Sequence, residues 1–274
     1  MRKVVRAEVP YPERLQNLTD KNHEQLLNHN NISNSVYGHV DVKASLMQLY
    51  FEKCYICEES VSAGMFDVEH YLPKRHFPQL GYTWSNLHKS CEVCNLAKEN
   101  KTFHIRNNDS EFADIKLLDP SSEEYNVYNY MRFNIDADAE LAGIGNDPIV
   151  VQKAEHTIKY LNGELDTERA RDLPHRRSKR VMAFMRYCAI DLASKKERIR
   201  EIKLNLDTYS KPREPLQEEE DSEICMKLIG ADHQFLSDKA PFSTCTRAQL
   251  QAIFGVSYSV LLQIKEKMRQ ELDL

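Results

Sequence analysis

The sequence predicts an α+β fold that is mostly helical and contains one small ββα unit clamped by a structural zinc. Three observations support this prediction. Two Cys-x2-Cys pairs are separated by 33 residues, short strand and helix patterns accompany them, and helical patterns flank them on both sides. We therefore expect an N-terminal helical segment (1–50), the ββα module (51–110) and a helical C-terminal region (111–274).

Composition excludes several classes of protein. The chain has 274 residues, enough for one large domain or two small ones, and 29% of them are charged. No apolar run has the roughly 18 residues that a membrane helix needs. The stretch MRKVVRAEVPYPER has no apolar core of signal-peptide length, so we expect a cytoplasmic protein without a membrane partner. With a net charge of -5, any nucleic-acid contact must come from a local basic patch.

The cysteines predict the zinc. Cys54 and Cys57 form one Cys-x2-Cys pair and Cys91 and Cys94 form the other, which together match the ligand set of a tetrahedral structural zinc. The alternative, four unrelated buried thiols, requires two matched pairs to arise by accident. In a reducing cytoplasm cysteines are more often metal ligands than disulfides. The isolated cysteines are predicted to be small core residues: Cys188, Cys225 and Cys245.

The residues between the two cysteine pairs predict the rest of the module. FDVEHYLPK (66–74) is typical of a short strand that stops before Pro73, and CEVCNLAKENK (91–101) is typical of a short helix. YTWSNLHKS (82–90) lies between them. The order is cysteine pair, short strands, loop, cysteine pair and helix.

These residues carry a family resemblance. The combination of Glu69-His70, Trp84-x-Asn86-Leu87 and Cys94-Asn95-x2-Lys98 resembles the motif of the HNH endonucleases in their zinc-clamped form. More narrowly, the chain resembles the HNH nuclease subunit of Septu-type antiphage systems, including those joined to retrons. Further stretches support the narrower match, and the resemblance extends over about 40–180: KLLDPSSEEYN (116–126) and AEHTIKYLNGELDTERARD (154–172).

The resemblance implies a role for each motif residue. Glu69 and Asn95 would bind a catalytic Mg²⁺ or Mn²⁺, and His70 would be the general base. Asn86 would pin the loop and orient that base. Apart from the resemblance, Lys98 lies three residues after Asn95 on the same helical face, and its charge suits it to hold a phosphate. The chemistry of the side chains agrees, because an imidazole with a pKa of about 6.5 is mostly neutral in the cell and a carboxylate is a hard oxygen ligand.

The resemblance implies a metal-dependent endonuclease that cleaves DNA as the effector of an antiphage defence complex. A partner ATPase, and retron components in some systems, would complete the complex. Two alternatives stay open: an RNA-cleaving effector with the same core, and a zinc-stabilised module that binds nucleic acid or protein without catalysis. Asp67, on the same strand face as Glu69, either assists the metal or is a solvated turn residue.

Two groups of basic residues are candidates for binding. Between residues 71 and 106, six basic residues face two acidic ones, a local excess that suits phosphate binding. From this group we predict nucleic-acid contacts at Lys74, Arg75, Lys89 and Lys101. A second basic group is either another nucleic-acid or partner surface or an ordinary solvated helix face: Arg176, Arg177, Lys179 and Arg180.

Outside the module the pattern is mainly helical. Helices are expected at 13–30 and 41–53, and again over 151–207 and 243–270. The intervening 107–150 is predicted to be rich in loops. QEEEDSE (217–223) is predicted to be either an acidic linker or the start of a helix.

Overall fold

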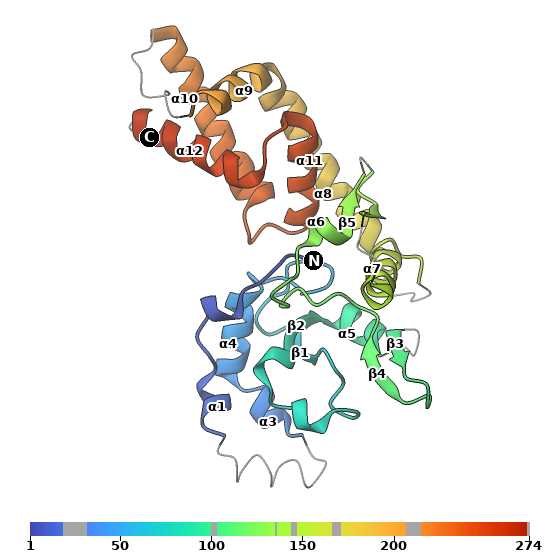
Figure 1. Cartoon of the computed structure of the whole chain (residues 1–274). Helices are drawn as coiled ribbons and strands as arrows, with labels where there is room; N and C mark the ends of the chain where they lie inside the picture. Colours follow the sequence, from blue (N-terminus) through green and yellow to red (C-terminus); the bar gives the residue numbers. More distant parts are fainter. Residues whose placement is uncertain are drawn as a thin grey trace. The chain divides into compact units, whose positions relative to one another are not determined.

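The computed structural model (Figure 1) describes residues 1–18, 32–99, 103–134, 136–143, 147–165, 171–206 and 215–272. Helices predominate, and the described residues form three two-stranded sheets. Contacts group the chain into two compact units, Met1–Arg132 with Ala139–Pro174 and Phe133–Asp138 with His175–Leu274. The divisions expected at residues 50 and 110 were drawn around motifs rather than contacts, and they stay a prediction.

The first sheet consists of β1 (Phe66–His70) and β2 (Leu87–Cys91), which pair antiparallel. Helix α5 (Glu92–Lys98) follows β2 without a break and packs against both strands (Figure 1). The strand predicted to end before Pro73 and the helix predicted after Cys91 are therefore confirmed. Pro73 cannot donate a backbone hydrogen bond, so the ladder cannot continue through it.

Helix α4 (Val40–Leu49) lies against β2 and buries Val42, Leu46 and Leu49 at helical spacing. The helix predicted for 41–53 is too long. Phe51 and Glu52 adopt left-handed backbone angles, with φ of 51° and 64°, which end the helix and turn the chain towards the first cysteine pair.

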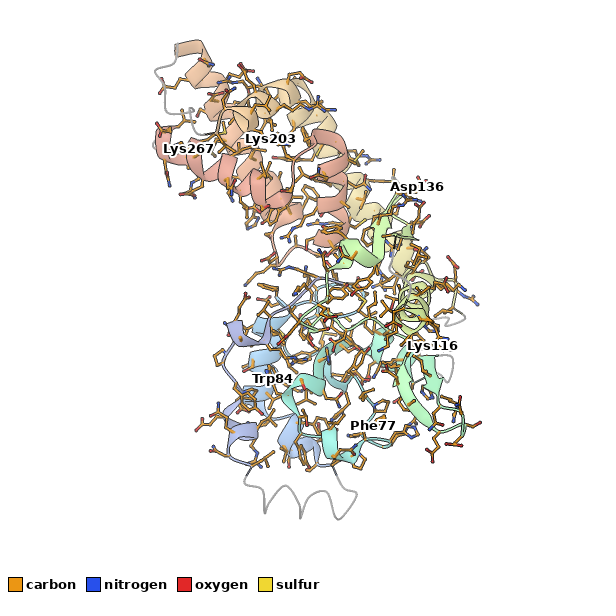
Figure 2. The ribbon with its side chains drawn as sticks, in the orientation of Figure 1. Phe77, Trp84, Lys116, Asp136, Lys203 and Lys267 are labelled. Atoms are coloured by element: carbon orange, nitrogen blue, oxygen red, sulfur yellow. The ribbon has the colours of Figure 1, made fainter. Side chains whose placement is uncertain are left out.

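The N-terminal helices are short. η1 covers Arg6–Glu8, α1 covers Glu13–Gln16 and α3 covers Asn34–Tyr37. Most of the helix predicted for 13–30 lies outside the described residues. The connection between β1 and β2 contains two single turns, η2 (Pro78–Leu80) and η3 (Trp84–Asn86), and carries Phe77 and Trp84, which Figure 2 labels.

Two further sheets lie where the sequence predicted mostly loops. β3 (His104–Arg106) pairs with β4 (Phe112–Ile115), and β5 (Met131–Phe133) pairs with β6 (Ala139–Leu141). Helix α6 (Val127–Tyr130) precedes β5. Strands of three or four residues are too short to show a period of two, so the pattern could not reveal them. Helix α7 (Pro148–Leu161) follows, with Asp147 as its N-cap.

The second unit is helical. It contains most of α8 (Leu173–Tyr187) and all of the later helices: α9 (Lys196–Leu204), α10 (Pro215–Ala231), α11 (Ser243–Phe254) and α12 (Tyr258–Leu272). Short turns join some of them: η5 (Cys188–Leu192), η6 (Ala193–Lys195) and η8 (Asp232–Leu236). The core includes Phe184, Ile224 and Phe254. Cys188, Cys225 and Cys245 are buried, as predicted.

The acidic stretch 217–223 lies inside α10, so it belongs to a helix and is not a linker. Asp221 is fully buried and accepts hydrogen bonds of 2.9 Å from Nε and Nη2 of Arg198. The buried carboxylate is therefore not left unpaired, because each of its oxygens accepts a hydrogen bond from the guanidinium. None of the described helices is long and apolar enough to cross a membrane.

Candidate functional site

The structure brings the four predicted zinc ligands together. The sulfur atoms of Cys54, Cys57, Cys91 and Cys94 all lie within 4.8 Å of one another, and those of Cys57 and Cys91 are 3.9 Å apart. A tetrahedral zinc with Zn–S bonds of about 2.3 Å separates its sulfur atoms by roughly 3.8 Å. The donor set and its spacing therefore fit a zinc ion.

Local structure positions each pair of thiols. Glu58 has a left-handed backbone (φ 62°), and its N–H donates to the Cys54 carbonyl at 3.1 Å, which closes the first turn. Cys91 ends β2 and caps α5, because its sulfur accepts the Cys94 N–H at 3.4 Å. Burial raises the pKa of the Cys94 thiol well above its usual range, so a metal cation would be the means of keeping it as a thiolate.

A further side chain contacts the cluster and was not predicted. The hydroxyl of Tyr160, on α7, donates to the sulfur of Cys94 at 3.2 Å, and both side chains are fully buried. This contact joins α7 to the module across 66 residues of sequence. Nothing in the spacing of the motifs indicates it, because it depends on how α7 packs.

A pocket of about 160 Å³ lies beside α5. From the β1 side it is lined by Glu69, His70, Pro73, Lys74 and Arg75. Helix α5 and the residues after it contribute Lys98, Glu99 and His104 to the lining. The structure thus brings together four of the predicted site residues that come from β1 and the segment after it, and adds Lys98 from the helix.

His70 is held as a neutral imidazole. Its Nε2 lies 2.9 Å from the carbonyl oxygen of Gly81 and its ring meets the Tyr37 ring edge-to-face at 4.7 Å. A carbonyl can only accept, so Nε2 carries the proton and Nδ1 keeps its lone pair. Desolvation, with smaller contributions from Lys74 and Lys98, lowers the pKa of His70 to about 4.

Glu69 and Lys98, which both line the pocket, form a partly buried ion pair. The Lys98 ammonium also donates to the carbonyl oxygen of His70, so helix α5 is tied to the end of β1. Desolvation raises the pKa of Glu69, and the Lys98 charge opposes that rise. Desolvation lowers the pKa of Lys98, and Glu69 opposes that fall in turn.

Asn86 holds the connection between the strands. Its Oδ1 accepts the Leu72 N–H at 2.7 Å, and its Nδ2 donates to the carbonyl oxygens of Leu72 at 3.0 Å and Leu80 at 3.2 Å. Leu80 precedes Gly81, whose carbonyl oxygen accepts the hydrogen bond from Nε2–H of His70. The side chain therefore orients the acceptor of the imidazole and does not itself line the pocket.

The sequence predicted that the Asn95 amide would lie beside the Glu69 carboxylate, and the structure places it elsewhere. The Asn95 amide donates to the carboxylate of Asp67 at 2.9 Å, and Asn95 is not among the residues that line the pocket. Asn95 and Lys98 are almost one turn apart on α5, and Asp67 and Glu69 are two residues apart on β1. The residue that reaches Glu69 is consequently Lys98, while Asn95 reaches Asp67.

The predicted nucleic-acid contacts divide into three cases. Lys74 and Arg75 line the pocket, and the Lys74 ammonium lies 4.2 Å from the centre of the Tyr37 ring. Lys101 lies outside the described residues. Lys89 was predicted wrongly: it is fully buried, and its ammonium donates to the carbonyl oxygens of Val61 at 2.8 Å and Glu52 at 3.3 Å.

The basic start of α8 does not form a single exposed surface. Arg177 is buried, and its Nε donates to the carbonyl oxygen of Ala137 at 2.5 Å. The guanidinium of Arg180 lies 4.6 Å from the centre of the Phe235 ring. Lys179 is exposed. At least two of the four cations therefore have structural contacts inside the second unit.

Sequence reasoning missed Glu99 as a pocket residue, and it also missed His104. It is the first residue of β3, six positions beyond the helix that carries Lys98, and no motif spacing marks it. Its side chain is buried and neither ring nitrogen has a hydrogen-bond partner. A histidine followed by isoleucine and arginine in a three-residue strand gives no periodic signal.

Comparison with known proteins gives one partial relation. No protein-family model matches the chain, and no solved structure matches it. The Septu protein PtuB of Bacillus thuringiensis is 39% identical over 67 residues, which are 24% of this chain and 26% of PtuB. The chain thus spans about a quarter of the length of this curated relative. The similarity supports a Septu-like relation for that part of the chain.

Proposed function

We propose that this chain is a metal-dependent HNH endonuclease that hydrolyses DNA as the effector of a Septu-type antiphage defence complex. The observation that carries the proposal is the pocket in which a neutral His70, fixed through Gly81, lies beside the carboxylate of Glu69. A scaffold that only bound its ligand would have no use for a desolvated base next to an acid. The four-cysteine cluster explains how so small a module holds them.

His70 acts as the general base. With Nε2 committed to the Gly81 carbonyl, Nδ1 is the atom that takes a proton from the attacking water. Because its pKa is lowered to about 4, the ring is neutral at cellular pH and Nδ1 has a free lone pair. Burial by Tyr37 and the loop held by Asn86 keep the ring in one orientation.

Glu69 is the protein ligand for the catalytic cation. Its carboxylate offers hard oxygens, which suit Mg²⁺ or Mn²⁺, and a bound ion would neutralise charge that develops on the phosphate oxygens. Asn95, turned to Asp67, contributes less to this site than its motif position implies. With one carboxylate from the protein, water and substrate phosphate would complete the coordination, which favours weak metal binding.

The cations around the pocket hold the substrate. Lys74 and Arg75 lie on its wall, and Lys98 lies at the end of α5. Their charges attract a polyanion although the whole chain is acidic. Lys98 also keeps Glu69 ionised and close to His70, so it orders the two reacting groups.

The role in defence rests on the similarity to the Septu protein. The resemblance of the motifs further implies a partner ATPase, with retron components in some systems. A nuclease with a pre-organised base and no restraint would damage its own host. Control by such a partner is therefore part of the proposal.

The experiment is a cleavage assay on the purified chain, alone and co-purified with its partner ATPase. Supercoiled plasmid, duplex DNA, single-stranded DNA and RNA are incubated with Mg²⁺ or Mn²⁺, and products are resolved on gels. Metal-dependent DNA cleavage supports the proposal. Cleavage of RNA alone would favour the RNA-cleaving effector. Binding without cleavage of any substrate, in either state of the complex, would contradict the nuclease assignment.

A further inference from the structure

His104 is a buried residue without a hydrogen-bonding partner in a polar pocket. Only 7% of its surface is exposed, and neither Nδ1 nor Nε2 has a partner among the described residues. Buried polar atoms in native proteins are almost always paired, because leaving one unpaired forfeits its hydration. An orphaned donor that lines a pocket therefore indicates a ligand that the pocket receives.

Aromatic packing holds this ring in place of hydrogen bonds. The Phe112 ring meets it edge-to-face, with centroids 4.7 Å apart and planes at 77°. The ring of His76 stacks on the same Phe112 ring, with centroids 4.6 Å apart and planes at 3°. The imidazole is thus oriented by the β3–β4 hairpin and the segment after β1, while both ring nitrogens are left without a hydrogen-bond partner among the described residues.

The charges near His104 decide which ligand it takes. Desolvation lowers its pKa most, and Arg75, His76, Arg106 and Lys98 lower it further, so the guanidinium and ammonium groups among them present positive potential to the ring. These positive charges favour an anionic ligand at the ring itself. Among the described residues, the four cysteines are the group of three or more potential ligands that can share an ion, and His104 is not one of them.

We propose that His104 donates its ring N–H to a non-bridging phosphate oxygen of the nucleic-acid strand, as a substrate-binding residue of the same pocket. This inference rests on the proposed nuclease function and adds a residue from β3 that holds the backbone of the substrate. The exposed side chains of Arg75 and of Arg106, whose Nη1 donates to the Ser110 carbonyl oxygen at 2.5 Å, would then contribute positive charge for the neighbouring phosphates. The chemistry recognised is a phosphate oxygen, so free inorganic phosphate would compete for the same donor.

The test measures binding apart from cleavage. All variants are made in a His70→Ala background, and the dissociation constant for a fluorescein-labelled DNA oligonucleotide is measured by anisotropy without added Mg²⁺. His104→Phe keeps the ring volume and its packing on Phe112 but removes the donor, and we expect weakening on the order of tenfold. His104→Gln retains an N–H and should recover much of the affinity. His233→Phe, an exposed histidine of the second unit, is the matched control and should bind like the parent.

A thermal melt distinguishes a ligand-binding histidine from a structural one. Without ligand, His104→Phe should melt at or above the temperature of the parent, by up to about 2–4 °C, because two unpaired buried nitrogens are removed. Inorganic phosphate should raise the melting temperature of the parent and not of His104→Phe. If phosphate stabilises the parent while the oligonucleotide Kd is unchanged by His104→Phe, the site binds free phosphate and the substrate role is wrong.

The other possible results of these experiments also support or overturn the proposal. An unchanged oligonucleotide Kd in His104→Phe overturns the inference. Weaker binding together with a lower melting temperature supports it only if His104→Gln restores binding, and contradicts it otherwise. Because these measurements need no cleavage, they can fail while the nuclease assay succeeds, and they can succeed while that assay fails.

Discussion

The Nε2 atom of His70, at the end of β1, lies 2.9 Å from the carbonyl oxygen of Gly81 in the connection to β2. Asn86 holds the same connection through hydrogen bonds to Leu72 and Leu80. The tautomer of a base is thereby set by a loop, and the loop by one asparagine. Because the ring is held in its neutral form, protonating it at low pH disfavours the folded state.

The stability of the protein should depend on pH through His70. Its folded-state pKa is about 4, below the ordinary 6.5, so the unfolded chain binds more protons between these values. The contribution is fully present above about pH 6.5 and is lost as pH falls towards 4. We expect the melting temperature of the parent to fall relative to that of His70→Ala as pH falls through this window. A difference that stays constant from pH 6.5 to 4 would show that His70 is not buried as a neutral ring.

The purified protein should carry one tightly bound zinc per chain. Replacing Cys91 with Ser removes one of the four thiolates while leaving a hydroxyl that can still cap α5, so the module should lose zinc and, with it, folded structure. Elemental analysis and circular dichroism measure the two effects. Cys245→Ser is the matched control, since this buried cysteine lies outside the cluster and its loss should leave the zinc content unchanged. A folded Cys91→Ser protein, or parent protein without zinc, would refute the assignment.

Tyr160 should tune the zinc site from α7. Tyr160→Phe removes the hydroxyl that donates to Cys94 and little else, so zinc affinity should fall about tenfold while the fold is kept. Competition with a colorimetric chelator measures the affinity. Tyr125→Phe, which removes another buried hydroxyl in the same unit, serves as the control and should hold zinc as the parent does. Equal affinities in all three proteins would mean that the contact has no influence on the metal.

Glu69 and Asn95 should differ in their effect on the catalytic metal. Glu69→Gln removes an anionic oxygen from the pocket, so the Mg²⁺ concentration needed for half-maximal cleavage should rise on the order of tenfold. Asn95→Ala removes a partner of Asp67 and should raise it less. EDTA at doses that spare the zinc should stop cleavage, and added Mg²⁺ or Mn²⁺ should restore it. A larger effect of Asn95→Ala than of Glu69→Gln would identify Asn95 as the main protein ligand of the catalytic metal.

The sequence was most informative where chemistry demands fixed spacing. Four thiolates can share one ion only if the chain returns to the same point, so two Cys-x2-Cys pairs predicted the cluster that the structure contains. The strand before Pro73 and the helix after Cys91 followed from local rules and are also present. These features depend on neighbours in sequence.

Features that depend on packing between distant segments were missed. Lys89 lies in a basic stretch, so the sequence predicted that it would be exposed and bind nucleic acid. Its ammonium instead donates hydrogen bonds to the carbonyl oxygens of Glu52 and Val61, which lie in irregular backbone. Spacing on α5 placed Asn95 and Lys98 on one face without showing which of them meets Glu69. His104 and Tyr160 enter from β3 and α7, whose positions no motif records.

The measurement that tests the central claim most directly is the single-turnover cleavage rate of His70→Ala. The account predicts a loss of about 100-fold or more, with zinc content, circular dichroism and DNA affinity close to those of the parent, because a general base acts only in the reaction. His233→Ala, an exposed histidine of the second unit, should cleave at the parent rate. Cleavage by His70→Ala at the parent rate, in a protein with full zinc content, would contradict the account.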